Sequence, residues 1–221
     1  MPIQLDQFAQ HYPRLYHMAE ANSWPSIQKH GLLSTSALLD LFEIDGDRRQ
    51  SLESQHRPNS VTITHPRHGQ AVIRDQKPLR QGPLAKCLIG MTAEQWYRTL
   101  NSYVFFWVTE KRLKKLIEAK AYRGKTQTII TVDTARLLET NARAVRLSPI
   151  NSGSTIYNPR PRGAGTFQRP SEYPFDERRR LRGLADAVAE LAVQYHVSDI
   201  SRCVLEVGHY KNGKLVKSIH P

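Results

Sequence analysis

The sequence predicts a single domain that mixes α-helices with β-strands. Its 221 residues are about 1.5 times the length of a typical domain, which favours one domain with elaborations over two complete ones. Residues 103–108 are all aromatic or β-branched, and such residues are enriched in strands. Thr109 then offers a helix N-cap, and Leu113, Leu116 and Ile117 follow at the spacings of three and four that form one helix face.

The first third of the chain alternates short strands with helices. A strand at residues 15–18 leads to Ser23, an N-cap followed by Pro25 in the first turn, and Gly31 ends the helix as a left-handed C-cap. A second helical piece runs through residues 38–42. The polar segment 45–59 is either looped or helical. The remaining expected elements are a strand at 61–64, a turn at 65–69 and an extended stretch at 71–74.

The second half predicts a strand at 128–132, a short helix at 134–139 and a strand at 144–147. Residues 148–175 contain five prolines and three glycines, which predicts a long basic loop of the kind that is either functional or disordered. Residues 185–193 have a helix-friendly composition, yet residues 190–197 fit a strand equally well, because periodicity alone does not separate the two for an apolar run. A strand at 204–207 and a turn at 211–214 indicate a terminal hairpin.

The net charge of +12 is concentrated in the second half of the chain. Residues 1–110 carry 11 Lys and Arg against 10 Asp and Glu, whereas residues 111–221 carry 21 against 10. This asymmetry favours a phosphate-rich partner, because Lys and Arg release the counterions condensed around phosphates. DNA, RNA, a dinucleotide and an acidic membrane surface all satisfy the pattern, and so does an inert basic surface.

Several classes of protein are disfavoured by what the sequence lacks. No stretch approaches the roughly 18 apolar residues that span a bilayer, and residues 1–30 carry no secretory signal, so we expect a cytoplasmic protein without a membrane partner. Cys87 and Cys203 are far apart, and His65 and His68 fit a surface turn, so we expect no disulfide framework and no metal. The motifs GxxxxGK[ST], GxGxxG and GxSxG are absent.

Four segments follow one another in an order that resembles a known enzyme superfamily. Tyr16-His17 lies in the first expected strand, and residues 24–33 read Trp-Pro-Ser-Ile-Gln-Lys-His-Gly-Leu-Leu. The apolar strand at 104–108 and an Ala-Glu-Leu-Ala-Val run at 189–193 come later. This order is similar to the ADP-ribosyltransferase superfamily, specifically its DarT-type nucleic-acid-modifying branch or a sister family of it. The first helix of that branch has the form x-P-S-I-x-x-H-G-L-L.

The resemblance implies one α+β domain over residues 1–221, built around a split, mostly antiparallel β-sheet with flanking helices. NAD would be the substrate, bound in the cleft between the two parts of the sheet. The implied NAD-binding residues are Tyr16, His17, Ser34, Arg74, Tyr103 and Phe105. His17 would hydrogen-bond the adenosine-side ribose, Arg74 would grip the diphosphate with its planar fork, and the aromatic rings would stack on the nicotinamide.

The resemblance also assigns catalysis to Glu190 together with His17. Transfer from NAD passes through an oxocarbenium-like state, so a carboxylate near the nicotinamide ribose would stabilise the developing positive charge and take a proton from the acceptor. Glu206 is the alternative carboxylate. In the basic loop, Arg160, Arg162 and Arg169 are interleaved with aromatic residues, which suits phosphate contact and base stacking in a nucleic-acid-binding segment.

The leading interpretation is a NAD-dependent ADP-ribosyltransferase, a glycosyltransferase that modifies DNA or RNA, in the setting of a toxin with an antitoxin protein as partner. A NAD-dependent RNA 2′-phosphotransferase shares the expected fold, but its family is expected to need no essential glutamate. A non-catalytic nucleic-acid-binding module predicts salt-sensitive binding without turnover of NAD.

Overall fold

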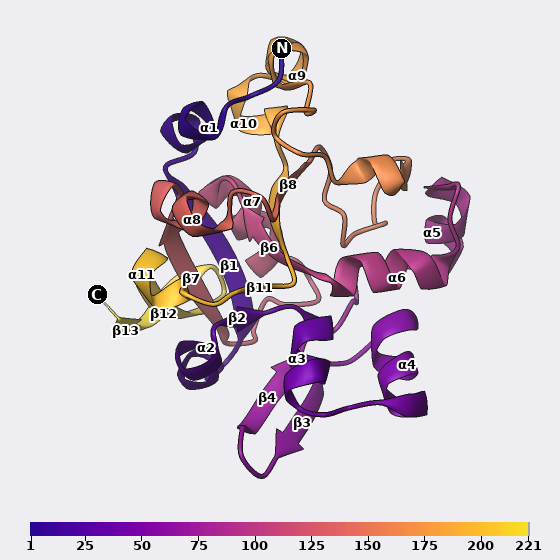
Figure 1. The fold of residues 1–221 in the computed structure, drawn as a ribbon, viewed down its shortest axis with the longest axis vertical. Helices are drawn as coiled ribbons and strands as arrows, with labels where there is room; N and C mark the ends of the chain where they lie inside the picture. Colours follow the sequence, from indigo (N-terminus) through magenta and orange to yellow (C-terminus); the bar gives the residue numbers. More distant parts are fainter. Residues whose placement is uncertain (221) are drawn as a thin grey trace.

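The computed structural model describes residues 1–220 and centres on a seven-stranded antiparallel sheet flanked by helices (Figure 1). The strands follow the order β13-β12-β7-β1-β6-β10-β8. Their bounds are β1 Arg14–Glu20, β6 Tyr103–Trp107, β7 Gln127–Asp133, β8 Val145–Ser148, β10 Glu190–Gln194, β12 Val204–Lys211 and β13 Lys214–His220. The expected α+β class with a large antiparallel sheet and flanking helices is confirmed.

Helices and short strands complete the fold. The helices are α1 Leu5–His11, α2 Trp24–His30, α3 Thr35–Leu41, α4 Gly46–Ser54, α5 Gln81–Cys87, α6 Ala93–Asn101, α7 Glu110–Ile117, α8 Thr134–Asn141, α9 Phe175–Arg182, α10 Leu184–Ala187, α11 Ile200–Cys203 and the 3-10 helix η1 Ala164–Thr166. The short strands are β2 Leu32–Leu33 with β11 His196–Val197, β3 Val61–His65 with β4 Gly69–Ile73, and β5 Leu88–Ile89 with β9 Arg162–Gly163.

The central sheet consists of two well-paired parts that meet at a single point. β1 pairs with β7 through seven residue pairs, and β6 pairs with β10 through five. Between β1 and β6, however, the only register pair is Tyr16 with Trp107 within the described chain. Trp107 also lies opposite Glu190, the first residue of β10. Tyr16, Trp107 and Glu190 therefore form one row across three strands, at the place where the ladder between β1 and β6 stops.

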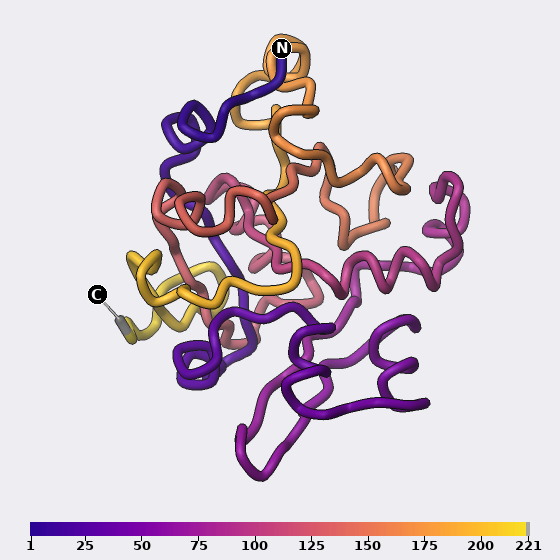
Figure 2. The backbone as a smooth tube through the Cα atoms, in the orientation of Figure 1, coloured from indigo at the N-terminus to yellow at the C-terminus, as the bar shows by residue number. Residues whose placement is uncertain are grey.

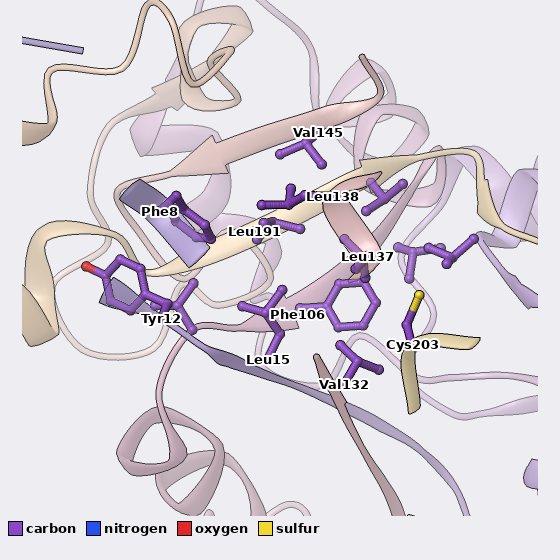
Figure 3. Packing of buried hydrophobic residues seen from close by; sticks show 14 of the residues in the cluster. Phe8, Tyr12, Leu15, Phe106, Val132, Leu137, Leu138, Val145, Leu191 and Cys203 are labelled. Carbon is purple, nitrogen blue, oxygen red and sulfur yellow. The ribbon is translucent and has the colours of Figure 1, made fainter. Parts of the chain in front are cut away.

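The core covers both faces of the sheet. On one face, strand residues such as Leu15, Phe106 and Leu191 pack against α1 and α8 (Figure 3). On the other face, a separate cluster joins Met18 to α7. A strand covered on both sides reads as a continuous apolar run instead of an alternating one, which is why residues 190–197 could not be assigned from periodicity. They form β10 and β11, separated by Tyr195 in the left-handed region at φ 69°.

Most other expected elements are present, but helices α1, α9 and α11 were not predicted, and two longer regions differ as well. The terminal hairpin turns at Asn212 and Gly213, which both have the positive φ of a two-residue turn. Residues 75–102, for which the sequence patterns gave no element, hold α5, β5 and α6. The expected loop at 148–175 is also more ordered than predicted, because it contains β9 and η1 and pairs with β5 beside α5 and α6 (Figure 2).

A second layer of α3, α4 and the β3–β4 hairpin lies below the central sheet in Figure 1. It has its own apolar cluster, which includes Leu39, Phe42, Ile63 and Ile73. The chain leaves β4 directly into Arg74, so this layer brings Arg74 to the opening between β1 and β6. None of the helices in residues 1–220 has the length and apolar character needed to cross a bilayer.

Candidate functional site

A cavity of about 540 Å³ opens where β1 and β6 separate. Its volume falls within the roughly 300–1,000 Å³ of ordinary small-molecule sites. Six residues singled out from the sequence line it: His17, Ser34, Arg74, Tyr103, Phe105 and Glu190. The structure thus brings a histidine from the first strand and a glutamate from the tenth strand to one cavity, as the resemblance implied; their roles there remain predictions.

His17 sits in the opening between the two parts of the sheet. Its Nδ1 lies 2.8 Å from the carbonyl oxygen of Phe105 on β6. A carbonyl oxygen only accepts, so the proton is on Nδ1 and Nε2 is left as an acceptor. Burial lowers the pKa of His17 to about 4; the bond to Phe105 opposes this shift and the charge of Arg74 adds to it. The ring is therefore neutral at physiological pH and offers hydrogen bonding instead of charge.

Glu190 is buried, with 4% of its surface exposed. Its two carboxylate oxygens both accept from the backbone N–H of Ser152, at 3.2 and 3.1 Å. Burial raises the pKa of Glu190 to about 7, against the lowering effects of hydrogen bonding from Ser152 and the charges of Arg112 and Arg162. Both protonation states are populated near neutral pH, which is the condition for a group that accepts and returns a proton.

Arg74 projects toward the cavity from the end of β4. Its Nη1 donates to the carbonyl oxygen of Met18 on β1 at 2.8 Å, and its guanidinium lies 5.3 Å from the centre of the Tyr122 ring. Within residues 1–220 this guanidinium makes no other hydrogen bond. The remaining N–H groups of the fork are thus available to an anionic ligand such as a phosphate.

An aromatic wall borders the cavity beside Phe105. The rings of Tyr103 and Phe105 both lie near Phe167, with centroids 5.0 and 5.8 Å away. The half-buried rings of Tyr103 and Phe105 offer a face to a planar group, and Phe167 packs against them without lining the cavity itself. Ser34 lines the cavity as well, but its hydroxyl oxygen accepts from the N–H of Ala37 and so caps α3.

Two residues considered for the site lie elsewhere. Tyr16, assigned to NAD binding by the resemblance, packs with the apolar cluster beneath α7 and is not among the residues that line the cavity. Met18 and Trp107 of the same cluster do line the cavity, and a part for Tyr16 in NAD binding stays a prediction. Glu206 on β12 forms an exposed ion pair with Arg14 at 3.4 Å, also outside the cavity lining. Between the two carboxylates, only Glu190 faces the cavity.

The basic segment at 148–175 contains both exposed and buried arginines. Arg160 and Arg169 are exposed, as a nucleic-acid contact requires. Arg162 is 3% exposed; its Nη1 donates to the carbonyl oxygen of Ser152 at 2.8 Å, and its guanidinium lies 5.8 Å from the centre of the Trp96 ring. The prediction of a surface contact at Arg162 is wrong, since β9 places this residue inside and its guanidinium binds the chain that carries Ser152.

Sequence reasoning also missed a basic surface on α9. Arg179, Arg180 and Arg182 are exposed and form no ion pair with the described residues. The run Arg178-Arg179-Arg180 is visible in the sequence, but only the structure shows that it precedes β10 on a helix and that its charges are not neutralised nearby.

The chain matches the profile of a family of unknown function, DUF7002, over residues 13–204. The chain belongs to this family. No curated protein matches it. The span shared with DUF7002 runs from just before β1 to the first residue of β12, and so contains His17, Arg74, Ser152 and Glu190. Helix α1 and the β12–β13 hairpin lie almost wholly outside it.

Proposed function

We propose that this DUF7002 protein transfers ADP-ribose from NAD to a nucleic acid. The observation that carries the proposal is the meeting of neutral His17, the Arg74 fork and buried Glu190 around one cavity of about 540 Å³. A dinucleotide needs a donor for its phosphates, a neutral partner for a ribose and an aromatic face for a ring. The cavity lining offers each of these groups.

The residues divide the chemistry between them. NAD supplies an ADP-ribose unit whose glycosidic bond to nicotinamide breaks with the electron pair moving to the nicotinamide ring. The Glu190 carboxylate stabilises the positive charge that develops on the ribose and takes the proton of the acceptor, whose nitrogen or oxygen forms the new bond to the ribose carbon. A carboxyl with a pKa of about 7 suits this exchange, because it can both accept and release a proton near neutral pH.

The charge of the protein supports a polyanionic acceptor. The second half of the chain holds most of the net charge of +12, and its exposed arginines include Arg160, Arg169 and the unpaired arginines of α9. Several cations on one molecule favour nucleic acid over a single small phosphate, because each phosphate contact releases counterions and the contributions add.

The test incubates the protein with labelled NAD and a panel of single-stranded DNA, duplex DNA, tRNA and protein extract. We expect label on one class of nucleic acid, loss of labelling in Glu190→Gln, and retention in the matched control Glu206→Gln, which removes an exposed carboxylate. Full labelling by Glu190→Gln would reject Glu190 as the catalytic carboxylate. Neither binding nor consumption of NAD by the wild type would reject the enzyme proposal and leave a nucleic-acid-binding module.

A second assay uses RNA with an internal 2′-phosphate. Removal of that phosphate with NAD, unaffected by Glu190→Gln, would identify a 2′-phosphotransferase instead. The toxin setting is tested by expressing the wild type and Glu190→Gln in bacteria, where growth arrest by the wild type alone is expected and would justify a search for an antitoxin protein.

A further inference from the structure

Ser152 lies between the two charged groups of the site. Its backbone N–H donates to both oxygens of Glu190, and its carbonyl oxygen accepts from Arg162 Nη1. The residue is 0% exposed, and together with Asn151 and Gly153 it lines the cavity. The peptide groups on both sides of Ser152 are therefore fixed, one by the carboxyl and the other by a buried guanidinium.

The hydroxyl of Ser152 is the unusual part of this arrangement. Its oxygen is buried and has no hydrogen-bond partner within the described part of the chain. Buried hydroxyl groups nearly always have a partner, so one without a partner calls for an explanation. The ionisable group beside it is Glu190, and the Ser152 side chain is close enough to contribute to lowering the pKa of that carboxyl.

The groups around Glu190 differ in what they offer to its two protonation states. The Ser152 N–H and the guanidinium groups of Arg112 and Arg162 can only donate, and so they serve the ionised carboxylate. Once the carboxyl holds a proton, its O–H needs an acceptor. A hydroxyl can rotate between donating and accepting, and Ser152 carries a hydroxyl next to Glu190 that has no other partner.

We propose that Ser152 is a positioning residue for Glu190. Its N–H fixes the carboxylate, its hydroxyl serves as donor to the ionised form and acceptor for the protonated form, and Arg162 holds Ser152 in place. The inference rests on the proposed function only in assigning Glu190 to the reaction. The contact between Ser152 and Glu190 itself can be measured without NAD.

The test is a carbon-13 NMR titration of the Glu190 carboxyl, identified by the resonance that is missing in Glu190→Gln. Ser152→Ala keeps the backbone N–H and removes only the hydroxyl, so the ionised carboxylate loses the donor that the proposal assigns to it. We expect the titration midpoint to rise by about 1 pH unit, the worth of a hydrogen bond to a charged group. The matched control is Ser154→Ala in the same segment, whose hydroxyl accepts from the N–H of Ile156 and does not line the cavity.

A midpoint in Ser152→Ala equal to that of the wild type and the control would overturn the proposal. If the alanine variant does not fold, Ser152→Cys keeps the size of the side chain with a weaker donor, and an unchanged midpoint there would overturn it equally. Where the protein turns over NAD, the lower limb of the pH profile of kcat should move to higher pH in Ser152→Ala and not in Ser154→Ala. An absence of turnover would refute the proposed function and leave the NMR result to decide the role of Ser152.

Discussion

Glu190 should make the protein less stable as the pH rises, and Glu190→Gln should remove this dependence. The side chain is buried, and burial raises its pKa from 4.5 to about 7. Glutamine has nearly the same shape, and its carbonyl oxygen can still accept from the N–H of Ser152 at the place where the carboxylate does. The substitution therefore removes the titration with little change in packing.

The direction of the effect follows from the pKa of Glu190 in the unfolded chain, 4.5, and in the folded chain, about 7. Below pH 4.5 the carboxyl is protonated in both the folded and the unfolded chain, so Glu190 adds no pH dependence. Between pH 4.5 and about 7 the unfolded chain ionises first, and the folded state loses stability relative to it. Above about pH 7 both states are ionised and the loss is constant.

The shift of about 2.5 units corresponds to roughly 3 kcal/mol of unfolding free energy. For a chain of this length, that amounts to a difference of roughly 6–12 °C in Tm. The assay is urea unfolding of the wild type and Glu190→Gln at several values between pH 5 and pH 8. We expect similar stabilities near pH 5 and a variant that is more stable than the wild type at pH 8.

Glu206→Gln supplies the control, because Glu206 is exposed and its ion pair with Arg14 is screened by solvent. Its stability relative to the wild type should change little over the same pH range. A difference between wild type and Glu190→Gln that stays constant from pH 5 to pH 8 would show that the pKa of Glu190 is not raised, and the argument for a proton-exchanging carboxyl would fail.

Two further predictions concern His17 and helix α9. Because burial lowers the pKa of His17 from 6.5 to about 4, the wild type should lose roughly 3 kcal/mol relative to His17→Gln as the pH falls from about 7 to 4; parallel stability curves for the two proteins would contradict this. Alanine at Arg179, Arg180 and Arg182 together should weaken nucleic-acid binding and make the slope of log K against log salt less negative by about 2–3. A control with the same charge change replaces three exposed lysines of the β12–β13 hairpin, Lys211, Lys214 and Lys217. Equal slopes for the two triple variants would exclude α9 as the binding surface.

The sequence predicts those parts of the fold whose signals are local. The helix that ends at Gly31 and the hairpin that turns at Asn212 and Gly213 depend on positive φ values that glycine and asparagine favour, so they are visible without any tertiary information. Helix α6 also had a readable signal, since Thr92 and Gln95 form a capping box.

The sequence predicts only some residues of the site, because the others are brought there by long-range strand pairing. His17 and Glu190 follow from a resemblance that preserves strand order, whereas Ser152 belongs to a segment whose position depends on the pairing of β9 with β5 and on Arg162. The same pairing turns Arg162 inward, although its neighbours Arg160 and Arg169 remain exposed. No local pattern distinguishes these arginines, because only long-range contacts decide which of them is buried.

The pKa values of the two titratable groups at the opening are shifted in opposite directions by the same cause, burial. Burial disfavours the charged form of both, so His17 is kept neutral by a lowered pKa and Glu190 is kept partly protonated by a raised one. A sheet built only for stability would close the gap between β1 and β6 with ladder hydrogen bonds and fill it with apolar side chains. This sheet instead stops pairing after Tyr16 and Trp107 and places His17 in the gap, where the histidine binds a carbonyl of the opposite strand. His17 and Glu190 both have shifted pKa values and face one cavity, a combination typical of functional sites, and this favours a chemical role for both residues.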